Sequence, residues 1–218
     1  MASLATPMAL RVAVTLGLPD RLADTPAAAA ALAPELAVDP IALELLLGHL
    51  ATLGIVEPTP AGYRTTAFGA HLGIAEPFTN ILLRLDSAAG RAELAFVELA
   101  HSIATGQAAY PRRYGQDFWA DLADSADLRA SFDRQMGLRF LDQAPRLAAG
   151  FDWSRFATVV DVGGGRGDLL AAILRAHPRV RGHLVDLAPT AAAAGSGGSR
   201  SSRRWPPRMG WSWTRWWI

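Results

Sequence analysis

The chain has no cysteine among its 218 residues and no long hydrophobic run. The first absence excludes disulfide bridges, thiolate catalysis and cysteine-based metal sites. No stretch approaches the roughly 18 apolar residues of a membrane-spanning helix. The first twenty residues have Arg11 in their middle and no basic start, unlike a signal peptide. Since half of the residues are hydrophobic, the chain can still bury a core, and we expect a soluble, cytoplasmic protein.

Lysine is also absent, so all 21 basic residues are arginines. Residues 1–190 combine 16 arginines with 20 acidic residues, whereas residues 191–218 have five arginines and no acid. The net charge of +1 therefore combines an acidic main part with a basic end. Five of the seven tryptophans also fall within residues 205–218, so the composition changes sharply near the C-terminus.

The most informative pattern is a run of glycines between a predicted strand and a predicted helix. Residues 158–162 are β-branched apart from Asp161, which predicts a buried strand. Glycines occupy positions 163, 164, 165 and 167, and apolar side chains then recur at helical spacing until Pro178. Glycine permits a sharp turn and a close approach of a ligand to the backbone, and the N–H groups that start a helix attract electron-rich groups. The pattern predicts the beginning of a nucleotide-binding βαβ unit.

The spacing of the glycines narrows the class of ligand that the loop is expected to bind. A dinucleotide-binding fingerprint that starts at Gly163 needs a third glycine at position 168, where the chain has Asp168. The glycines fall instead at 163, 165 and 167, after Asp161, and a second predicted strand over residues 183–187 ends near Asp186. A carboxylate there can accept both ribose hydroxyls of an adenosine. The alternative is a structural glycine turn in another kind of α/β unit.

The N-terminal part is predicted to be helical with one hairpin. Apolar residues at i+4 spacing from Leu4 to Leu16 predict a helix over residues 3–18. Further helices are predicted over 26–38 and 40–53, and short strands over 55–57 and 62–66, which together form a winged-helix arrangement. The helix predicted over residues 40–53, which would read DNA in a winged-helix protein, has no arginine, although contacts with DNA phosphates need cations. We therefore expect a dimerisation module, with a DNA-binding regulator as the alternative.

Residues 66–150 are predicted to be mainly helical. One helix carries residues 94–101, and another starts at Asp127 and ends at Pro145. Phe118 and Trp119, in an aromatic and basic connector, either line a pocket for a planar substrate or fill core between helices. The second interpretation is favoured because aromatic side chains dominate ordinary cores.

Four segments of the chain resemble the bacterial small-molecule O-methyltransferases that depend on S-adenosylmethionine (SAM), in particular the branch that modifies anthracyclines and other aromatic polyketides. The matching segments are residues 6–16, 92–122, 127–132 and 151–178, so the helical parts match as well as the glycine loop. An aspartate that ends one strand, a Gly-x-Gly-x-Gly turn and an acid that ends the next strand look like the SAM site of a class I methyltransferase.

This resemblance implies a mixed α and α/β fold. Its parts are a winged-helix dimerisation domain over residues 1–85, a helical linker and substrate cap over 86–150, and the first part of a Rossmann-like SAM-binding domain over 151–190. By position, Arg129 resembles the arginine that reaches the SAM carboxylate, Gly163 the glycine whose backbone approaches SAM, and Asp186 the acid that holds the ribose. The residues implied to bind the cofactor SAM are Arg129, Asp161, Gly163, Gly165, Gly167 and Asp186.

The reaction implied by the resemblance is methyl transfer from SAM to a hydroxyl of an aromatic polyketide-type natural product. The implied partners are a small aromatic substrate and a second copy bound through the N-terminal helices, with no nucleic acid, membrane or metal. One relative of the same branch keeps SAM yet hydroxylates its substrate. A SAM-binding hydroxylase or decarboxylase is therefore the alternative within the family.

The family's general-base histidine and its third to seventh strands find no counterpart after Gly163, so no catalytic residue is assigned. Residues 191–218 have the Arg, Ser, Gly, Pro and Trp composition that a G/C-rich gene yields when read out of frame. We therefore expect an aberrant tail on a truncated product that binds SAM weakly and does not turn over. The alternative for this tail is a basic, aromatic surface for RNA or membranes.

Overall fold

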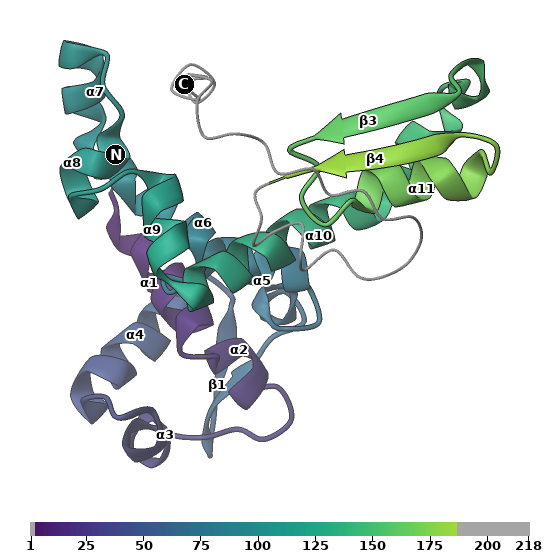
Figure 1. The fold of residues 1–218 in the computed structure, drawn as a ribbon. Helices are drawn as coiled ribbons and strands as arrows, with labels where there is room; N and C mark the ends of the chain where they lie inside the picture. The colour runs from purple at the N-terminus through teal and green to yellow at the C-terminus, as the bar shows by residue number, and fades with distance from the viewer. Residues whose placement is uncertain (1–2, 187–218) are drawn as a thin grey trace. The chain divides into compact units, whose positions relative to one another are not determined.

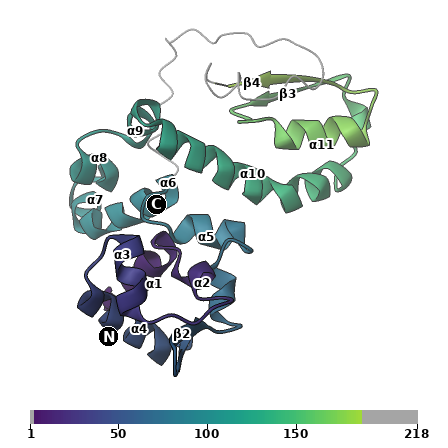
Figure 2. The ribbon, with the colours of Figure 1, turned by 90° about the horizontal axis from the view of Figure 1, so that it is seen from below.

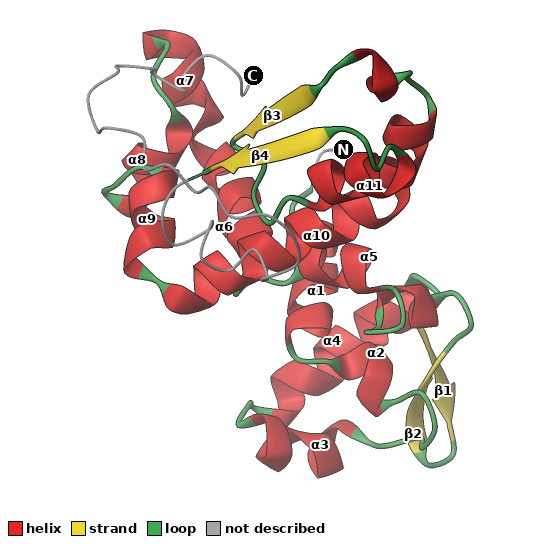
Figure 3. Cartoon of the chain, turned by 45° about the vertical axis from the view of Figure 1, so that its right-hand side comes forward, coloured by secondary structure: helices red, strands yellow, loops and turns green. Residues whose placement is uncertain are grey.

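The computed structural model describes residues 3–186. The chain divides into two compact units, Met1–Phe132 and Asp133–Ile218. Figure 3 shows that helices predominate and that the described strands form two separate pairs. None of the described helices has the length and apolar content needed to cross a membrane. The expectation of an aberrant tail concerns residues 191–218, which lie outside the described residues.

The first unit begins with four helices and a hairpin, whereas the sequence predicts three helices and a hairpin (Figure 1). The elements are α1 (Ala5–Thr15), α2 (Leu18–Arg21), α3 (Ala29–Leu36), α4 (Pro40–Thr52), β1 (Val56–Thr59) and β2 (Gly62–Thr65). The helix predicted over residues 3–18 is shorter, because Gly17 adopts a left-handed conformation (φ +68°) that separates α1 from α2. Asp39 caps α4 by accepting a hydrogen bond from the Ala42 amide at 2.8 Å, and Pro40 occupies the first helical position.

Helices α1 to α4 and the hairpin share one apolar core. Leu47 and Leu50 of α4 are fully buried, whereas Leu46 and Leu53 pack at its edge. The predicted stripe on α1 is wrong in detail: Leu4 is exposed, and the buried residues of this helix are Ala13 and Val14. The buried members of this core are Ala13, Leu18, Leu22, Ala29, Leu32, Ala33, Leu43, Leu47, Leu50, Ile55 and Val56.

The rest of the first unit consists of short helices. They are η1 (Gly69–Leu72), α5 (Pro77–Leu83), α6 (Ala88–Leu94), η2 (Ala95–Glu98), α7 (Leu99–Thr105), α8 (Ala109–Tyr114) and α9 (Phe118–Asp124), with η denoting 3₁₀ turns. The single helix predicted over residues 94–101 is wrong, because η2 interrupts it between α6 and α7. Arg11 of α1 ties these helices to the N-terminal core: its guanidinium donates to the Leu82 carbonyl at 3.0 Å and pairs with Glu93 at 3.6 Å.

Helix α10 (Ala126–Ala149) begins in the first unit and ends in the second. The prediction that this helix stops at Pro145 is wrong, since Pro145 lies inside it and the helix continues for another turn. Proline removes one backbone donor and usually bends a helix without always ending it. In the second unit, Ala144 and Ala148 of α10 pack against Ala172 and Ile173 of the next helix.

The second unit contains η3 (Trp153–Arg155), β3 (Thr158–Val162), α11 (Asp168–Ala176) and β4 (Arg181–Val185). The order strand, helix, strand and the bounds of β3 agree with the sequence prediction. Strands β3 and β4 are parallel, with Thr158 opposite Arg181 and Val162 opposite Val185. Figures 1 and 2 show α11 along one face of this pair. The prediction that β3 is buried is wrong: Val160 and Val162 are 57% and 67% exposed, on the face away from α11.

Candidate functional site

The candidate site lies where β3 and β4 end. Because the two strands are parallel, their carboxyl ends meet at one edge, which brings the glycine loop after Val162 beside Asp186 after β4. The Gly163 amide donates to the Val185 carbonyl at 2.7 Å, and the Gly165 amide donates to Oδ2 of Asp186 at 2.7 Å. Residues 21 positions apart in sequence are thus joined directly.

The loop conformation depends on its glycines. Gly163, Gly165 and Gly167 have φ values of +73°, +60° and +80°, in the left-handed region that side-chain-bearing residues rarely adopt. A Cβ added at Gly163 or Gly165 would meet no atom within 4 Å, so the surface of the loop at these two positions is open. The loop ends at the start of α11, whose first N–H groups are the usual attraction for an electron-rich ligand.

Gly164 fills a different role, which the sequence interpretation overlooked. A Cβ at this position would lie 2.3 Å from Oδ2 of Asp161 and 2.6 Å from Cδ1 of Leu184. The backbone of Gly164 therefore lies against the side chains of Asp161 on β3 and Leu184 on β4, and a larger residue forces these side chains or the loop to shift. The signal was present in the sequence as an uninterrupted run of glycines, but the two side chains that crowd Gly164 come from different strands that only the fold brings together.

Asp161 and Asp186 approach the same loop from the two strands. Burial raises the pKa of the Asp161 carboxyl above its ordinary value, and the negative charge of Asp186 raises the pKa further. Two carboxylates with unequal surroundings therefore stand at the edge of the sheet. Of these two, Asp186 is the one that makes the hydrogen bond to the loop amide.

We expect Asp161→Asn to flatten the acid-range pH dependence of stability and to raise the free energy of unfolding at neutral pH. Because the pKa of Asp161 is higher in the folded chain than its ordinary 3.8, the folded state binds this proton more tightly than the unfolded state does. The contribution of Asp161 to stability is therefore fully present below 3.8 and is lost as the pH rises through the raised value. Urea unfolding from acidic to neutral pH, with Asp142→Asn as an exposed control, measures this. Equal pH slopes for wild type and Asp161→Asn would contradict the assignment.

The structure brings five of the six predicted site residues together, namely Asp161, Gly163, Gly165, Gly167 and Asp186. The sixth, Arg129, lies half-buried on α10 within the first compact unit, whereas the loop belongs to the second. Its role toward a ligand of the loop therefore stays a prediction from the family resemblance. Among the described residues, no cluster of histidines and acids has the arrangement of a metal site.

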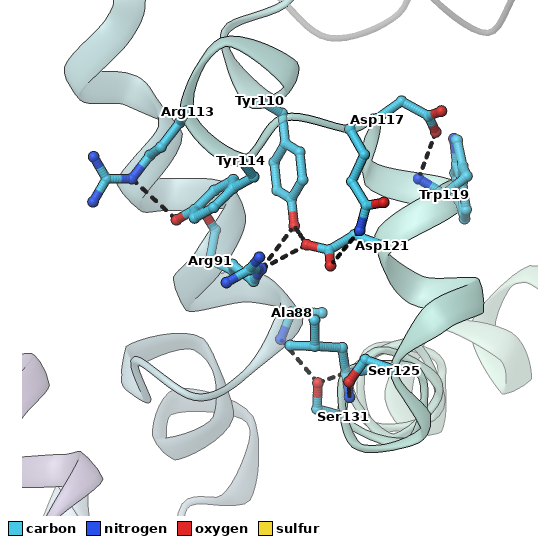
Figure 4. A network of polar contacts seen from close by, with 12 residues as sticks. Ala88, Arg91, Tyr110, Arg113, Tyr114, Asp117, Trp119, Asp121, Ser125 and Ser131 are labelled. Carbon is cyan, nitrogen blue, oxygen red and sulfur yellow. Dashed lines mark hydrogen bonds and ion pairs between the residues drawn. The ribbon is translucent and has the colours of Figure 1, made fainter.

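A second polar centre lies in the helices of the first unit (Figure 4). Arg91 of α6 donates to Asp121 of α9 at 2.6 Å, and Gln116 donates to the other carboxylate oxygen at 3.0 Å. Tyr110 of α8 donates to the same carboxylate, and the Arg91 guanidinium stacks 4.0 Å from the Tyr114 ring centre. This network links three short helices and holds a buried charge with a full set of donors.

Titration in this network follows from burial and pairing. Burial alone would raise the pKa of Asp121, but the hydrogen bonds from Tyr110, Arg91 and Gln116 outweigh it, so the pKa lies below its ordinary value. The pKa of the Tyr110 hydroxyl is raised, chiefly by burial and then by the bond to Asp121. The network therefore stays ionised at Asp121 and neutral at Tyr110 near neutral pH, as a structural brace requires.

The aromatic residues of the connector form a cluster of edge-to-face contacts. The ring centres of Phe118 and Trp119 lie 5.3 Å apart, and the ring centre of Phe132 on α10 lies 5.7 Å from that of Phe118. Phe118 is half-buried, which agrees with the core interpretation, but Trp119 is 43% exposed. The alternative interpretation, a surface for a planar ligand, thus stays open for Trp119.

Comparison with known proteins finds a family match for two parts of the chain. Residues 1–74 match the family model of an O-methyltransferase dimerisation domain, and residues 96–203 match that of an O-methyltransferase domain. A 2,7-dihydroxy-5-methyl-1-naphthoate 7-O-methyltransferase of Streptomyces carzinostaticus is 44% identical over 89% of this chain and 59% of its own. The aclacinomycin 10-hydroxylase of Streptomyces purpurascens is 40% identical over 89% of this chain and 53% of its own.

Solved structures give the same result. The crystal structure of an O-methyltransferase from neocarzinostatin biosynthesis, in complex with S-adenosyl-L-homocysteine and 1,4-dihydroxy-2-naphthoic acid, matches with a TM-score of 0.83 at 44% identity. The match covers 88% of this chain and 60% of that one. The chain thus spans little more than half the length of the relatives it matches.

A parallel βαβ unit with a glycine turn after its first strand and an acid after its second strand is the beginning of a class I methyltransferase fold. With a dimerisation domain in front of it, the chain belongs to the O-methyltransferase family. The match of residues 1–74 favours dimerisation over DNA reading for the winged-helix part.

Proposed function

We propose that the chain is a SAM-dependent O-methyltransferase that acts on a hydroxyl of an aromatic polyketide-type natural product, as a homodimer in the cytoplasm. The observation that carries the proposal is the hydrogen bond between the Gly165 amide and Asp186 at the carboxyl edge of β3 and β4. It supports an adenosine site because it brings an acceptor for ribose hydroxyls beside an open glycine backbone.

The residues present fit the SAM molecule. The open backbone at Gly163 and Gly165 suits close contact with its amino acid and ribose parts, which a Cβ would obstruct. Asp186 would accept from the ribose hydroxyls, and Arg129 would pair with the SAM carboxylate. SAM, when bound, supplies an activated methyl group for in-line displacement by the acceptor oxygen. The contribution of this chain is to hold the two partners in line, which can account for much of the rate.

The proposed methyl acceptor and the proposed protein partner are inferred from the matches to known proteins. One relative is named for a naphthoate, and another, 36% identical, is named for mitomycin biosynthesis. The dimerisation model over residues 1–74 supports a second copy as the protein partner. No general base is assigned to any residue of this chain, so deprotonation of the acceptor hydroxyl stays outside the proposal.

A second candidate is a SAM-binding hydroxylase, which the 40% identity to aclacinomycin 10-hydroxylase favours. Since the sequence predicts no turnover by this chain, any product that does form from a hydroxynaphthoic acid and SAM identifies the reaction by its mass. Methylation adds one carbon and two hydrogens, whereas hydroxylation adds one oxygen. The SAM site is shared, so binding measurements do not separate these candidates.

Calorimetry with SAM tests the site itself. We expect weak but saturable binding to the wild-type chain, and a loss of at least about tenfold in Asp186→Ala, because a charge-assisted hydrogen bond contributes roughly 1.5–3 kcal/mol. Asp142→Ala is the matched control: it removes an exposed carboxylate whose described partner is Arg146 on the same helix. Equal affinity in Asp186→Ala and wild type, or no heat with wild type, would contradict the proposal.

A further inference from the structure

An open apolar pocket lies between the end of α10 and the start of β3, in the second unit. Its volume is about 480 Å³, which is in the range of small-molecule sites. Most of the lining is apolar, and its large side chains stay accessible: Leu147, Phe151 and Phe156 are 48%, 44% and 46% exposed. We call this the η3 pocket, and its residues are Arg146, Leu147, Gly150, Phe151, Trp153 and Phe156.

The η3 pocket is separate from the glycine loop. Phe156 precedes β3 and the loop follows it, and a strand of five residues is about 16 Å long. A ligand in this pocket therefore lies at the opposite edge of the strand pair from Asp186 and does not occupy the proposed SAM site. Its binding is independent of the proposed function.

The aromatic side chains of the pocket form a surface suited to stacking. The rings of Phe151 and Phe156 are within 11° of parallel with their centres 6.1 Å apart, and Trp153 meets the Phe151 ring edge-on at 5.0 Å. The Trp153 indole N–H donates to the Leu147 carbonyl at 3.2 Å, and the Phe156 amide donates to the Trp153 carbonyl at 3.1 Å. Because these bonds fix the turn that carries the rings, a flat aromatic ligand would bind at a low cost in ordering.

The edge of the pocket is positively charged. Arg146 is the charged residue of the lining, and the side chains of its ion pair with Asp142 are 79% and 82% exposed. Such an exposed pair is weak, so a ligand carboxylate can compete with Asp142 for the guanidinium. Arg155 adds a second exposed positive charge to the same short turn. The apolar lining and the positive edge together favour a ligand that is both aromatic and anionic.

We propose that the η3 pocket is a second binding site, which takes a small planar aromatic carboxylate. The flat ring system stacks on Phe151 and Phe156, and the carboxylate pairs with Arg146. A neutral aromatic molecule meets the same rings without the ion pair, whereas an aliphatic acid lacks the stacking. Trp153 also packs on the core that α10 shares with α11, so a bound ligand stabilises the second unit.

Calorimetry of the full chain with 2-naphthoate, in the absence of SAM, tests the site. We expect saturable binding to the wild type and a loss of about tenfold in Phe151→Ala, because the substitution removes a stacked ring. Trp119→Ala is the control: it removes an equally exposed aromatic ring from the first unit and should leave the affinity unchanged. Circular dichroism confirms that each variant is folded.

Two further variants test the positive edge without altering the rings. Asp142→Asn releases Arg146 from its partner and should tighten 2-naphthoate binding about twofold, whereas Arg146→Gln should weaken it about threefold. Neither variant should change the affinity for 2-naphthol, which offers the same rings and is uncharged at neutral pH.

Three results overturn the inference. The first is wild-type affinity in Phe151→Ala, with the loss in Trp119→Ala instead, since the ligand then binds in the first unit. The second is the absence of saturable heat with the wild type. The third is unchanged 2-naphthoate affinity in both Asp142→Asn and Arg146→Gln, which decides the question even if Phe151→Ala does not fold. None of these results bears on SAM, because the proposed function is judged by the Asp186→Ala titration.

Discussion

Replacing Gly164 with alanine is expected to reduce SAM affinity by at least about tenfold, the effect of roughly 1.4 kcal/mol of lost binding. The added methyl group would overlap Oδ2 of Asp161 and Cδ1 of Leu184, so these side chains or the loop have to shift. We expect the loop to move, because Cγ of Asp161 also lies within 2.4 Å of the added carbon, and this movement displaces the Gly165 amide from Asp186. Calorimetric titration of the variant with SAM measures the loss.

Gly48→Ala is the control for this substitution. Gly48 lies inside α4, and the nearest atom to an added Cβ is the Tyr63 hydroxyl at 4.0 Å, an ordinary contact. This variant should bind SAM as the wild type does and gain slightly in stability, since alanine favours a helix. Wild-type affinity in Gly164→Ala would show that the close packing of the loop on β4 is not needed for SAM.

Asp121→Ala should lower the free energy of unfolding of the first unit by about 3 kcal/mol, the low end of the range for breaking a buried ion pair. The variant removes the shared acceptor of Arg91, Tyr110 and Gln116 and leaves a buried hydroxyl without its partner. The low end applies because the Arg91 side chain is one-third exposed and water can solvate part of its charge. Urea unfolding followed by circular dichroism gives the value.

Arg146→Ala is the comparison for a surface ion pair. It breaks an exposed pair with Asp142 on the same helix, for which at most about 0.5 kcal/mol is expected. If Asp121→Ala lost no more stability than this control, the helical network would not be the brace that its geometry indicates. Tyr110→Phe should lie between the two, since it removes one of three donors to the carboxylate.

Local patterns predicted the parts of the site that depend on neighbours in sequence. The run of β-branched residues marked β3 within its observed bounds, and the Asp39–Pro40 pair marked the start of α4. The position of Asp186 beside the glycine loop also follows from the sequence, because parallel strands connected by a helix must end at the same edge, whereas its role toward SAM stays a prediction. Each of these inferences needed only spacing and residue type.

Contacts between distant residues explain what the sequence did not predict. The crowding at Gly164 comes from the side chain of Asp161 and, twenty positions away on a neighbouring strand, from that of Leu184. The break of the helix at η2 and the continuation of α10 through Pro145 depend on packing rather than on local propensity. Tyr110, Asp121 and Arg91 belong to three separate helices, and their individual positions carry no pattern that predicts a network.

We expect the outward face of β3 to influence how the chain behaves in concentrated or salty solution. Val160 and Val162 expose apolar side chains along one strand, without the self-limiting geometry of a twofold contact. A twofold dimer contact would stop at two copies, whereas association through β3 would continue to larger aggregates that scatter light. Kosmotropic salts strengthen apolar burial and favour the second process. Turbidity and sedimentation therefore report on different surfaces of the same molecule.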